Sequence, residues 1–197
     1  MSLTLNQRLE ILRTKLSNVN NLNKNNVGGD MKFFIFDFNP KDEMRVRDEV
    51  QKAINANAEI VSFDLYEMML EIIKENGYFE TIKNMESEYE KELLLVEVFQ
   101  PMLALEQTGN EILNRFKHRV ADDGKHIVLI NGVGKAYPII RSHTILNNLQ
   151  SIFKRNPVVM MYPGRFSARK GHLKLFDRLL DDNYYRATPI IERGEDY

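Results

Sequence analysis

The stretch "HIVLINGVGKAYPIIRSH", residues 126–143, decides how the rest of the chain is interpreted. Its apolar run predicts a strand that is buried on both faces, because such strands carry continuous Val, Ile and Leu. A loop with two glycines and a lysine follows, and "SHTILNNLQSIFKR", residues 142–155, predicts a helix. A strand, a glycine loop and a helix in this order form many phosphate-binding sites. The first question is therefore whether this loop binds a phosphate.

The loop lacks residues that define the known phosphate loops. A Walker motif, G-x-x-x-x-G-K-[ST], can be aligned on Gly134 and Lys135. Leu129 then stands where the first glycine should be, and Ala136 stands where a Ser or Thr should bind Mg²⁺. The G-x-G-x-x-G pattern fails at its third glycine. What remains is a tight backbone turn at Gly132 and Gly134 that brings Lys135 near an anion, and a purely structural turn is the alternative.

Strands alternate with helices along the whole chain, which predicts a mostly parallel sheet flanked by helices. Buried strands are expected at 32–38, 59–65, 125–132 and 157–164, with a short fifth strand at 172–176. We therefore expect an α/β fold with a sheet of four to five strands that resembles a degenerate P-loop-like nucleotide-binding domain.

The chain of 197 residues suits a single domain, 1–197, with two unusual parts. An acidic helical insertion is expected at about 78–121, with breaks at Pro101 and Gly109. A basic C-terminal part is expected at about 124–176.

Charge is unevenly distributed, although the net charge is only -1. Residues 1–108 carry 12 Lys and Arg against 19 Asp and Glu, whereas residues 109–197 carry 15 against 9. No acidic residue occurs between Asp123 and Asp177. Such a stretch predicts a positive surface for nucleic acid, nucleotide phosphate or an acidic protein face. Neutralisation by the acidic N-terminal half within the fold is the alternative.

In open α/β sheets, ligands bind outside the carboxyl ends of the strands. If the four main strands are parallel, Asp37, Asp64, the turn 131–135 and the segment 162–165 share one edge, called here the strand-end rim. Asp37 and Asp64 are weak candidates for binding Mg²⁺. Helix capping explains them as well, because Asp64 with Glu67 matches a capping box and Asn39 precedes a proline that can begin a helix.

The remaining candidate residues are cations, a histidine and tyrosines in the C-terminal half. Arg and Tyr are favoured at protein interfaces, and cations contact phosphates. The candidates for binding an anion or a partner are Lys135, Arg141, His143, Arg165, Arg169, Lys170, Tyr184, Tyr185 and Arg186. An exposed connecting loop that carries cations for solubility is the alternative for the most basic of these segments.

The absence of cysteine excludes disulfides, zinc–thiolate sites and thiol nucleophiles. The histidines are too scattered to form a metal site, and we expect no cofactor. The N-terminus lacks the apolar core of a signal peptide, and no run has the roughly 18 apolar residues of a membrane span. We therefore expect a soluble cytoplasmic protein without membrane contact, and its oligomeric state remains open.

Three segments, "GVGKAYPIIRSHTILNNLQ", "PVVMMYPGRF" and "LKLFDRLLDDNYYRATPI", together resemble the BrxB family. This family is the small α/β component of bacterial and archaeal BREX phage-defence systems. The resemblance covers roughly the last third of the chain, and it supplies no established catalytic residues. It implies a role in defence alongside the PglZ-type phosphatase-like protein, the large ATPase BrxC and the adenine methyltransferase PglX.

The sequence therefore predicts a non-catalytic adaptor or scaffold that contacts partner proteins, with DNA as a further candidate. One alternative is a Mg²⁺-dependent enzyme of phosphate chemistry, a nucleotidase or nuclease that uses Asp37 and Asp64. Converging carboxylates would favour this enzyme, whereas carboxylates used as helix caps would argue against it. The other alternative is direct DNA binding, with an affinity that falls steeply as salt rises.

Overall fold

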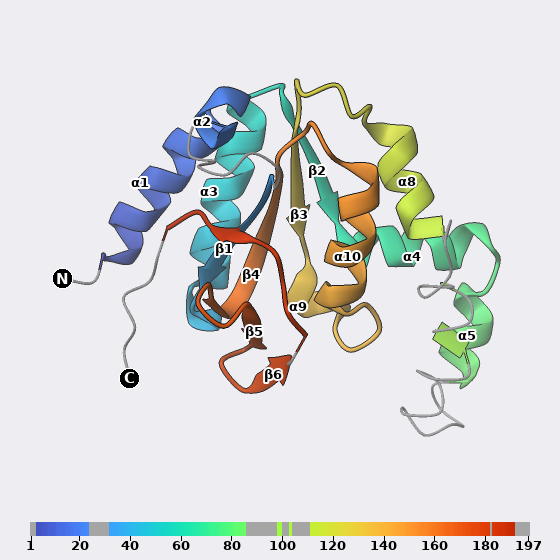
Figure 1. Cartoon of the computed structure of the whole chain (residues 1–197). Helices are drawn as coiled ribbons and strands as arrows, with labels where there is room; N and C mark the ends of the chain where they lie inside the picture. The colour runs from blue at the N-terminus through green and yellow to red at the C-terminus, as the bar shows by residue number, and fades with distance from the viewer. Residues whose placement is uncertain are drawn as a thin grey trace.

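The computed structural model describes residues 3–23, 32–85, 98–99, 103, 111–181 and 183–191. A central sheet lies between two layers of helices (Figure 1). The mostly parallel α/β fold expected from the sequence is confirmed.

Four long strands form the middle of the sheet in the order β2-β3-β4-β1, and all are parallel. Their bounds are Phe33–Phe38 for β1, Ile60–Asp64 for β2, Ile127–Asn131 for β3 and Val158–Ser167 for β4. The short strand β7, Thr188–Pro189, adds to the outer side of β1. β4 extends beyond its parallel neighbours, and its end pairs with an antiparallel hairpin of β5, His172–Leu175, and β6, Leu179–Asp181.

The sheet has seven strands, so the prediction of four to five was wrong. The two strands that were not predicted, β6 and β7, are three and two residues long. Segments of that length are too short to show a periodic pattern. The resemblance to a P-loop domain is not confirmed, because the loop after β3 leads into a single helical turn, α9, Val133–Ala136.

Helices cover both faces of the sheet (Figure 1). One face carries α1, Leu5–Leu16, α2, Val19–Asn23, and α3, Glu43–Ala56, which follows a short 3-10 turn, η1, Pro40–Asp42. The other face carries α4, Leu65–Glu75, α8, Glu111–Arg119, and α10, Ser142–Ile152. α5, Phe79–Met85, continues from α4 at the side of the molecule.

Alternation along the strands divides the buried residues into two cores. In β1, Phe33 and Ile35 pack toward α4, α8 and α10, whereas Phe34, Phe36 and Phe38 pack toward α1, α2 and α3. Successive side chains of a strand point to opposite faces, so a strand that is covered on both faces must be apolar at every position. This explains the continuous apolar runs of the sequence.

Both predicted helix caps are confirmed. The Asp64 carboxylate accepts hydrogen bonds from the backbone N–H groups of Tyr66, at 3.0 Å, and Glu67, at 3.2 Å, at the start of α4. The Asn39 side chain accepts from the N–H of Lys41 at 3.0 Å, at the start of η1. Each cap satisfies backbone donors that the first helical turn leaves without partners.

The predicted acidic insertion is described only at its two ends, by α5 and α8. Ile112, Leu113 and Phe116 of α8 are buried, and the Phe116 ring stacks on Phe63 of β2 with centroids 4.2 Å apart. The predicted breaks at Pro101 and Gly109 lie outside the described residues.

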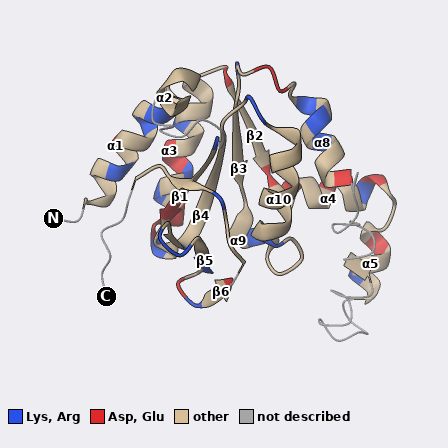
Figure 2. Cartoon of the chain, viewed as in Figure 1, with Lys and Arg blue, Asp and Glu red and all other residues tan. Residues whose placement is uncertain are grey.

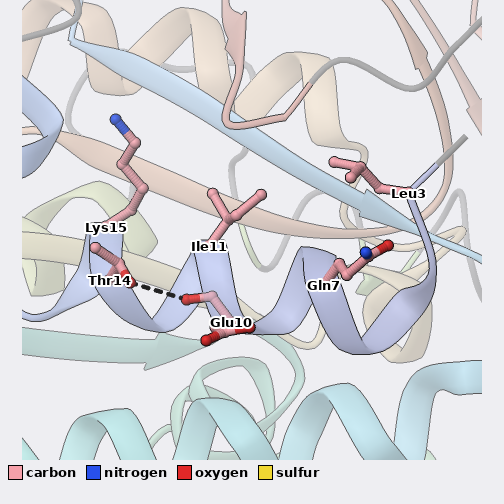
Figure 3. A pocket seen from close by; sticks show the side chains of 6 residues that line it. All are labelled: Leu3, Gln7, Glu10, Ile11, Thr14 and Lys15. Carbon is pink, nitrogen blue, oxygen red and sulfur yellow. Dashed lines mark hydrogen bonds between the residues drawn. The ribbon is translucent and has the colours of Figure 1, made fainter. Parts of the chain in front are cut away.

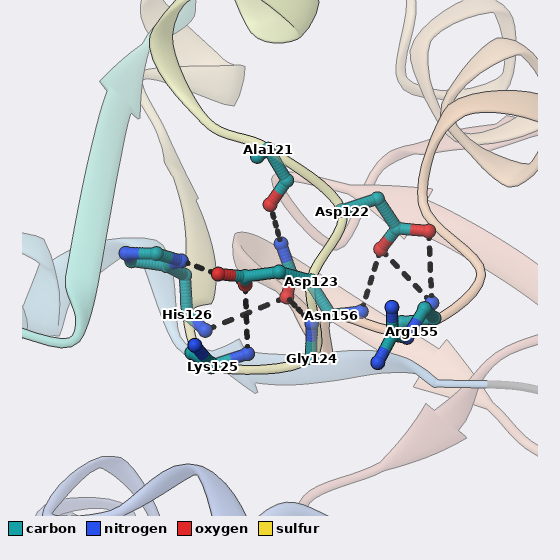
Figure 4. Close-up of polar contacts among 8 residues, drawn as sticks. All are labelled: Ala121, Asp122, Asp123, Gly124, Lys125, His126, Arg155 and Asn156. Atoms are coloured by element: carbon teal, nitrogen blue, oxygen red, sulfur yellow. Dashed lines mark hydrogen bonds and ion pairs between the residues drawn. The ribbon is translucent and has the colours of Figure 1, made fainter.

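The loops at the amino ends of β3 and β4 are held together by two side chains (Figure 4). The Asp122 carboxylate accepts from the backbone N–H groups of residues 154, 155 and 156. The fully buried Asn156 accepts from the N–H of Gly124 at 2.7 Å and donates to the carbonyl of Ala121 at 2.7 Å. These bonds fix the two central strands at the end of the sheet opposite the strand-end rim.

None of the helices in the described part of the chain is long and apolar enough to cross a membrane.

Candidate functional site

The predicted strand-end rim exists, because β1, β2, β3 and β4 are parallel and end at the same edge of the sheet. Its two aspartates do not meet. Asp37 is on β1 and Asp64 is on β2, and β3 and β4 lie between them. At about 4.8 Å between strands, the two positions are about 14 Å apart. Within the described ranges, no three acidic or histidine side chains are grouped as metal ligands.

Asp37 forms a buried ion pair. Nη2 of Arg8 lies 2.8 Å from Oδ1 of Asp37 and donates at 2.6 Å to the Asp37 carbonyl. Oδ2 of Asp37 accepts from the N–H of Phe166 at 3.1 Å. The Arg8 guanidinium also lies over the ring of Phe36, 4.9 Å from its centroid. The charge of Asp37 is therefore compensated inside the protein.

The position of this ion pair matters, because it lies where α/β folds usually bind ligands. β1 continues into α3 on one face, while β4 continues into the β5–β6 hairpin, whose Leu173 and Leu175 pack on the other face. Ligands bind at the crevice between neighbouring strands whose connections diverge in this way. Here the guanidinium of Arg8 contacts that end of β1 instead. The sequence contained a signal for this residue, since Arg8 falls on the apolar face of α1, three positions after Leu5.

Asp64 is also engaged by the protein itself. Besides capping α4, its Oδ2 accepts from Nζ of Lys135 at 2.7 Å. The same ammonium lies 3.7 Å from a carboxylate oxygen of Glu67 and 5.4 Å from the ring centroid of Tyr66. Lys135 thus has two carboxylates and an aromatic ring around it, and its charge is balanced within the rim.

The two glycines make room for side chains of this chain. Gly132 has φ of 73°, and a Cβ there would lie 2.2 Å from Oδ1 of Asp64. A Cβ at Gly134 would lie 2.9 Å from the Phe176 ring and 3.0 Å from Pro163. In a phosphate loop, a ligand approaches the glycine backbone this closely. Here a carboxylate and an aromatic ring occupy that space.

A small cavity remains between the rim and α3, with a volume of about 160 Å³. Its charged lining is balanced, with Glu43 and Asp64 against Arg47 and Lys135. Ligand pockets usually have about 300 Å³ or more, and a phosphate site needs an excess of positive charge. Neither condition is met. Glu43 and Arg47 lie on α3, and no sequence signal marked them because they resemble ordinary solvent-exposed helix residues.

A wider groove, of about 420 Å³, lies along the outer side of α1 (Figure 3). All of its lining side chains come from residues 3–15, and the hydroxyl of Thr14 donates to the carbonyl of Glu10 within it. A groove built from one helix and its N-terminal flank brings no converging groups together, so we assign no chemistry to it.

A polar cluster joins the motifs "RSH" and "DDNYYRA", which lie far apart in the sequence. Oδ2 of Asp181 accepts from the hydroxyl of Tyr185 at 2.5 Å and lies 3.3 Å from Nδ1 of His143. Oδ1 of Asp181 accepts from the side chain of Asn183 at 2.6 Å. The start of α10 is thereby linked to the end of β6. Asp181 was not among the predicted site residues, although the acid pair in its motif was a signal.

Burial opposes the ionisation of Asp181, but the hydrogen bonds from Tyr185, Asn183 and His143 outweigh it and lower the pKa of Asp181. Burial, together with the hydrogen bond to Asp181, raises the pKa of the Tyr185 hydroxyl. Burial likewise raises the pKa of the Tyr162 hydroxyl, in the centre of the fold. Tyr185 is itself buried, so this candidate residue supports the surface and does not form it.

The other predicted binding residues lie around the β5–β6 hairpin and the start of α10, and all of them except the half-buried His143 are exposed. Figure 2 shows cations along this part of the chain. Arg165 lies 3.4 Å from Asp177, and Tyr184 is 67% exposed. The exposed cations are Arg141, Arg165, Arg169, Lys170, Lys174, Arg178 and Arg186. The structure therefore separates Lys135, which is paired within the rim, from the cations that face solvent.

Comparison with known proteins gives one family. The family model described as "BREX protein BrxB" matches residues 61–190. A protein named BREX protein BrxB from Bacillus cereus (strain H3081.97) is 36% identical over 194 residues, covering 96% of this chain and 98% of its own. A second protein of that name, from Escherichia coli O9:H4 (strain HS), is 23% identical over 190 residues, covering 95% and 92%. No solved structure matches the chain significantly.

Proposed function

Because this chain belongs to the BrxB family of BREX proteins, we propose that it is a non-catalytic adaptor of a BREX-type anti-phage defence complex. One observation carries the non-catalytic part of the proposal. The carboxylates at the ends of β1 and β2 are paired within the chain, Asp37 with Arg8 and Asp64 with Lys135. A catalytic or ligand-binding rim would need such groups to be available to a substrate.

The proposed docking surface lies beside the rim, at the start of α10 and on the β5–β6 hairpin. Arg141 is exposed there, and His143 contacts the hairpin through Asp181. Cations, together with the exposed Tyr184, are typical of protein interfaces. In this account Lys135 supports the rim from inside and does not contact the partner. The proposed partners are the PglZ-type, BrxC-type and PglX-type proteins of the same system, all in the cytoplasm.

Direct DNA binding is the second candidate, and the exposed cations of the C-terminal half favour it. It predicts an affinity that falls steeply with salt, because each phosphate contact releases counterions. Alanine at Arg165, Arg169 and Lys170 together should then weaken DNA binding without unfolding the protein. If these substitutions leave DNA affinity unchanged, this surface has no role in DNA binding.

The adaptor proposal is tested by mixing the purified chain with each of the three partner types and measuring complex formation by size-exclusion chromatography. We expect a stable complex that the Arg141→Ala, His143→Ala double variant weakens by roughly tenfold, as for an interface hot spot. Arg45→Ala, which removes an exposed cation from α3, is the control and should leave the complex intact.

If the unmodified chain forms no complex with any partner, the adaptor proposal is wrong. Nucleotide and DNA hydrolysis assays with Mg²⁺ then become decisive. Activity that is lost in Asp37→Asn or Asp64→Asn variants would support the enzyme of phosphate chemistry instead.

A further inference from the structure

Large exposed apolar side chains gather on the β5–β6 hairpin. Among the described residues, those with substantial exposure are Leu3, Met44, Tyr78, Phe79, Leu179, Leu180 and Tyr184. Three of them fall between residues 179 and 184, with Leu180 59% and Tyr184 67% exposed. Scattered exposed apolar residues need no explanation, whereas a cluster of them marks an interaction site.

Tyr184 is held in place although it is exposed. Its ring packs on Gly171, where a Cβ would lie 2.5 Å from the ring atoms. The carbonyl of Gly171 accepts from the N–H of Tyr185 at 2.8 Å, which ties the two segments together. An aromatic side chain that is already fixed loses little conformational entropy on binding. Tyr184 is therefore suited to be an anchor for a partner.

The Asp181 cluster fixes the rest of this surface. Its carboxylate holds the side chain of Asn183, the hydroxyl of Tyr185 and the ring of His143. Asn183 and Tyr185, which flank Tyr184 in the sequence, are thus attached to α10 through Asp181. Leu180 directly precedes Asp181, so Leu180 and Tyr184 both adjoin residues that are held in place.

β6 has a free edge, because among the described strands it pairs only with β5. A strand edge offers backbone N–H and C=O groups to another extended chain. The register places Arg165, Lys174 and Leu180 side by side across β4, β5 and β6, so their side chains share one face. This face joins two cations to an apolar residue directly beside the free edge.

We propose that the free edge of β6, with Leu180 and Tyr184, binds an extended acidic and apolar segment of a partner protein by strand addition. The segment's backbone pairs with β6, its apolar side chains contact Leu180 and Tyr184, and its carboxylates face Lys174 and Arg178. This inference rests on the proposed adaptor function and specifies the chemistry of the segment that is bound.

Protein is favoured over nucleic acid at this surface for two reasons. The free edge of β6 offers backbone N–H and C=O groups that pair with another extended peptide backbone, which a nucleic acid does not supply. Leu179 and Leu180 are exposed aliphatic side chains, which suit contact with apolar side chains of a protein. Both features suit an extended protein segment that is partly apolar.

The first test measures binding of a fluorescent peptide in which Glu alternates with Val and Tyr, by fluorescence anisotropy with the full chain. We expect binding that falls by at least roughly tenfold in a Leu180→Ser, Tyr184→Ala variant. Met44→Ser removes an equally exposed apolar side chain from α3 and should leave the affinity unchanged. The same peptide with Lys in place of Glu should bind at least about tenfold more weakly.

Equal affinity of the Glu and Lys peptides, or of wild type and the double variant, would overturn the proposal. The proposal would also be overturned if the peptide did not bind, while a single-stranded oligonucleotide bound to the wild type and not to the double variant. The peptide experiment needs no other BREX protein, so it separates this inference from the adaptor function as a whole.

The second test places a photo-crosslinking amino acid at position 180 or 44 in the assembled complex. We expect a cross-link from position 180 to an acidic extended segment of a partner, identified by mass spectrometry, and none from position 44. A cross-link from position 180 to a second copy of this chain, or to a basic segment, would contradict the proposal.

Discussion

The strand-end rim and the β5–β6 hairpin differ in how their charged and apolar groups are used. In the rim, Arg8 pairs with Asp37 and Lys135 pairs with Asp64, so the place where this fold usually binds ligands is occupied by the chain itself. On the hairpin, Leu180 and several cations face solvent. A set of site-like residues in the sequence therefore indicates a binding site only once it is known which side chains those residues contact in the fold.

The largest predicted effect tests whether the rim depends on its buried ion pair. Arg8→Leu leaves the carboxylate of Asp37 buried without its cation, which should lower the free energy of unfolding by about 3–5 kcal/mol. Arg13→Ala on the same helix removes an exposed ion pair with Glu49 and should have a much smaller effect. Urea denaturation of both variants measures the difference. Similar small losses in the two would show that the rim is not held by this pair.

The next prediction tests why the loop after β3 contains glycine. Gly132 and Gly77 have nearly the same φ, 73° and 74°, but only at Gly132 would a Cβ meet another group, the Asp64 carboxylate. Gly77→Ala should cost about 1 kcal/mol of backbone strain. Gly132→Ala should lower the free energy of unfolding by about 1–3 kcal/mol more than Gly77→Ala, because the added Cβ overpacks the rim.

Thermal or chemical unfolding of the two alanine variants measures this excess. Removing the carboxylate in an Asp64→Ala background should abolish most of it. If the excess persists in that background, the glycine is required for a reason other than the approach of Asp64.

A smaller effect tests how the hairpin is attached. Asp181→Asn weakens the bonds to Tyr185 and His143 and should cost about 1–2 kcal/mol near neutral pH. The pKa of Asp181 is lowered in the folded protein, so its contribution is present above the unfolded pKa of about 3.9 and is lost as pH falls through the folded pKa. The difference between wild type and variant should therefore shrink below about pH 4.

The smallest predicted effect on stability separates docking from folding. Leu180→Ser and Tyr184→Ala should each change the free energy of unfolding by less than about 0.5 kcal/mol, because both side chains are largely exposed. Docking should nevertheless fall by roughly tenfold. A loss of stability of several kcal/mol would mean that these residues belong to the core of the hairpin and that their exposure has no functional meaning.

Local features of the fold could be predicted from the sequence. The four long strands follow from continuous apolar runs, and the caps at Asn39 and Asp64 follow from side chains that bond to backbone groups two or three residues away. The strand order could not be predicted, because β1 is followed in sequence by β2 but lies beside β4. That order alone decides that Asp37 and Asp64 are far apart.

The candidate site could be predicted only in outline. The pairing of Arg8 with Asp37 and of Lys135 with Asp64 spans 29 and 71 residues, and nothing near either residue in the sequence indicates its partner. The close approach of Phe176 to Gly134 likewise joins residues that are far apart in the sequence. Tyr184 and Tyr185 are neighbours in one motif, yet one is exposed and the other is buried, which only the turn after β6 determines.

The most direct test of this account compares a rim variant with a hairpin variant in one measurement. Lys135→Met, the Leu180→Ser, Tyr184→Ala variant and the unmodified chain are each assembled with the other BREX proteins, and the bound fraction is measured by size-exclusion chromatography. We expect that Lys135→Met retains the complex and that the hairpin variant loses it. A complex that is lost with Lys135→Met and retained with the hairpin variant would contradict the account, because the rim would then be the surface that binds.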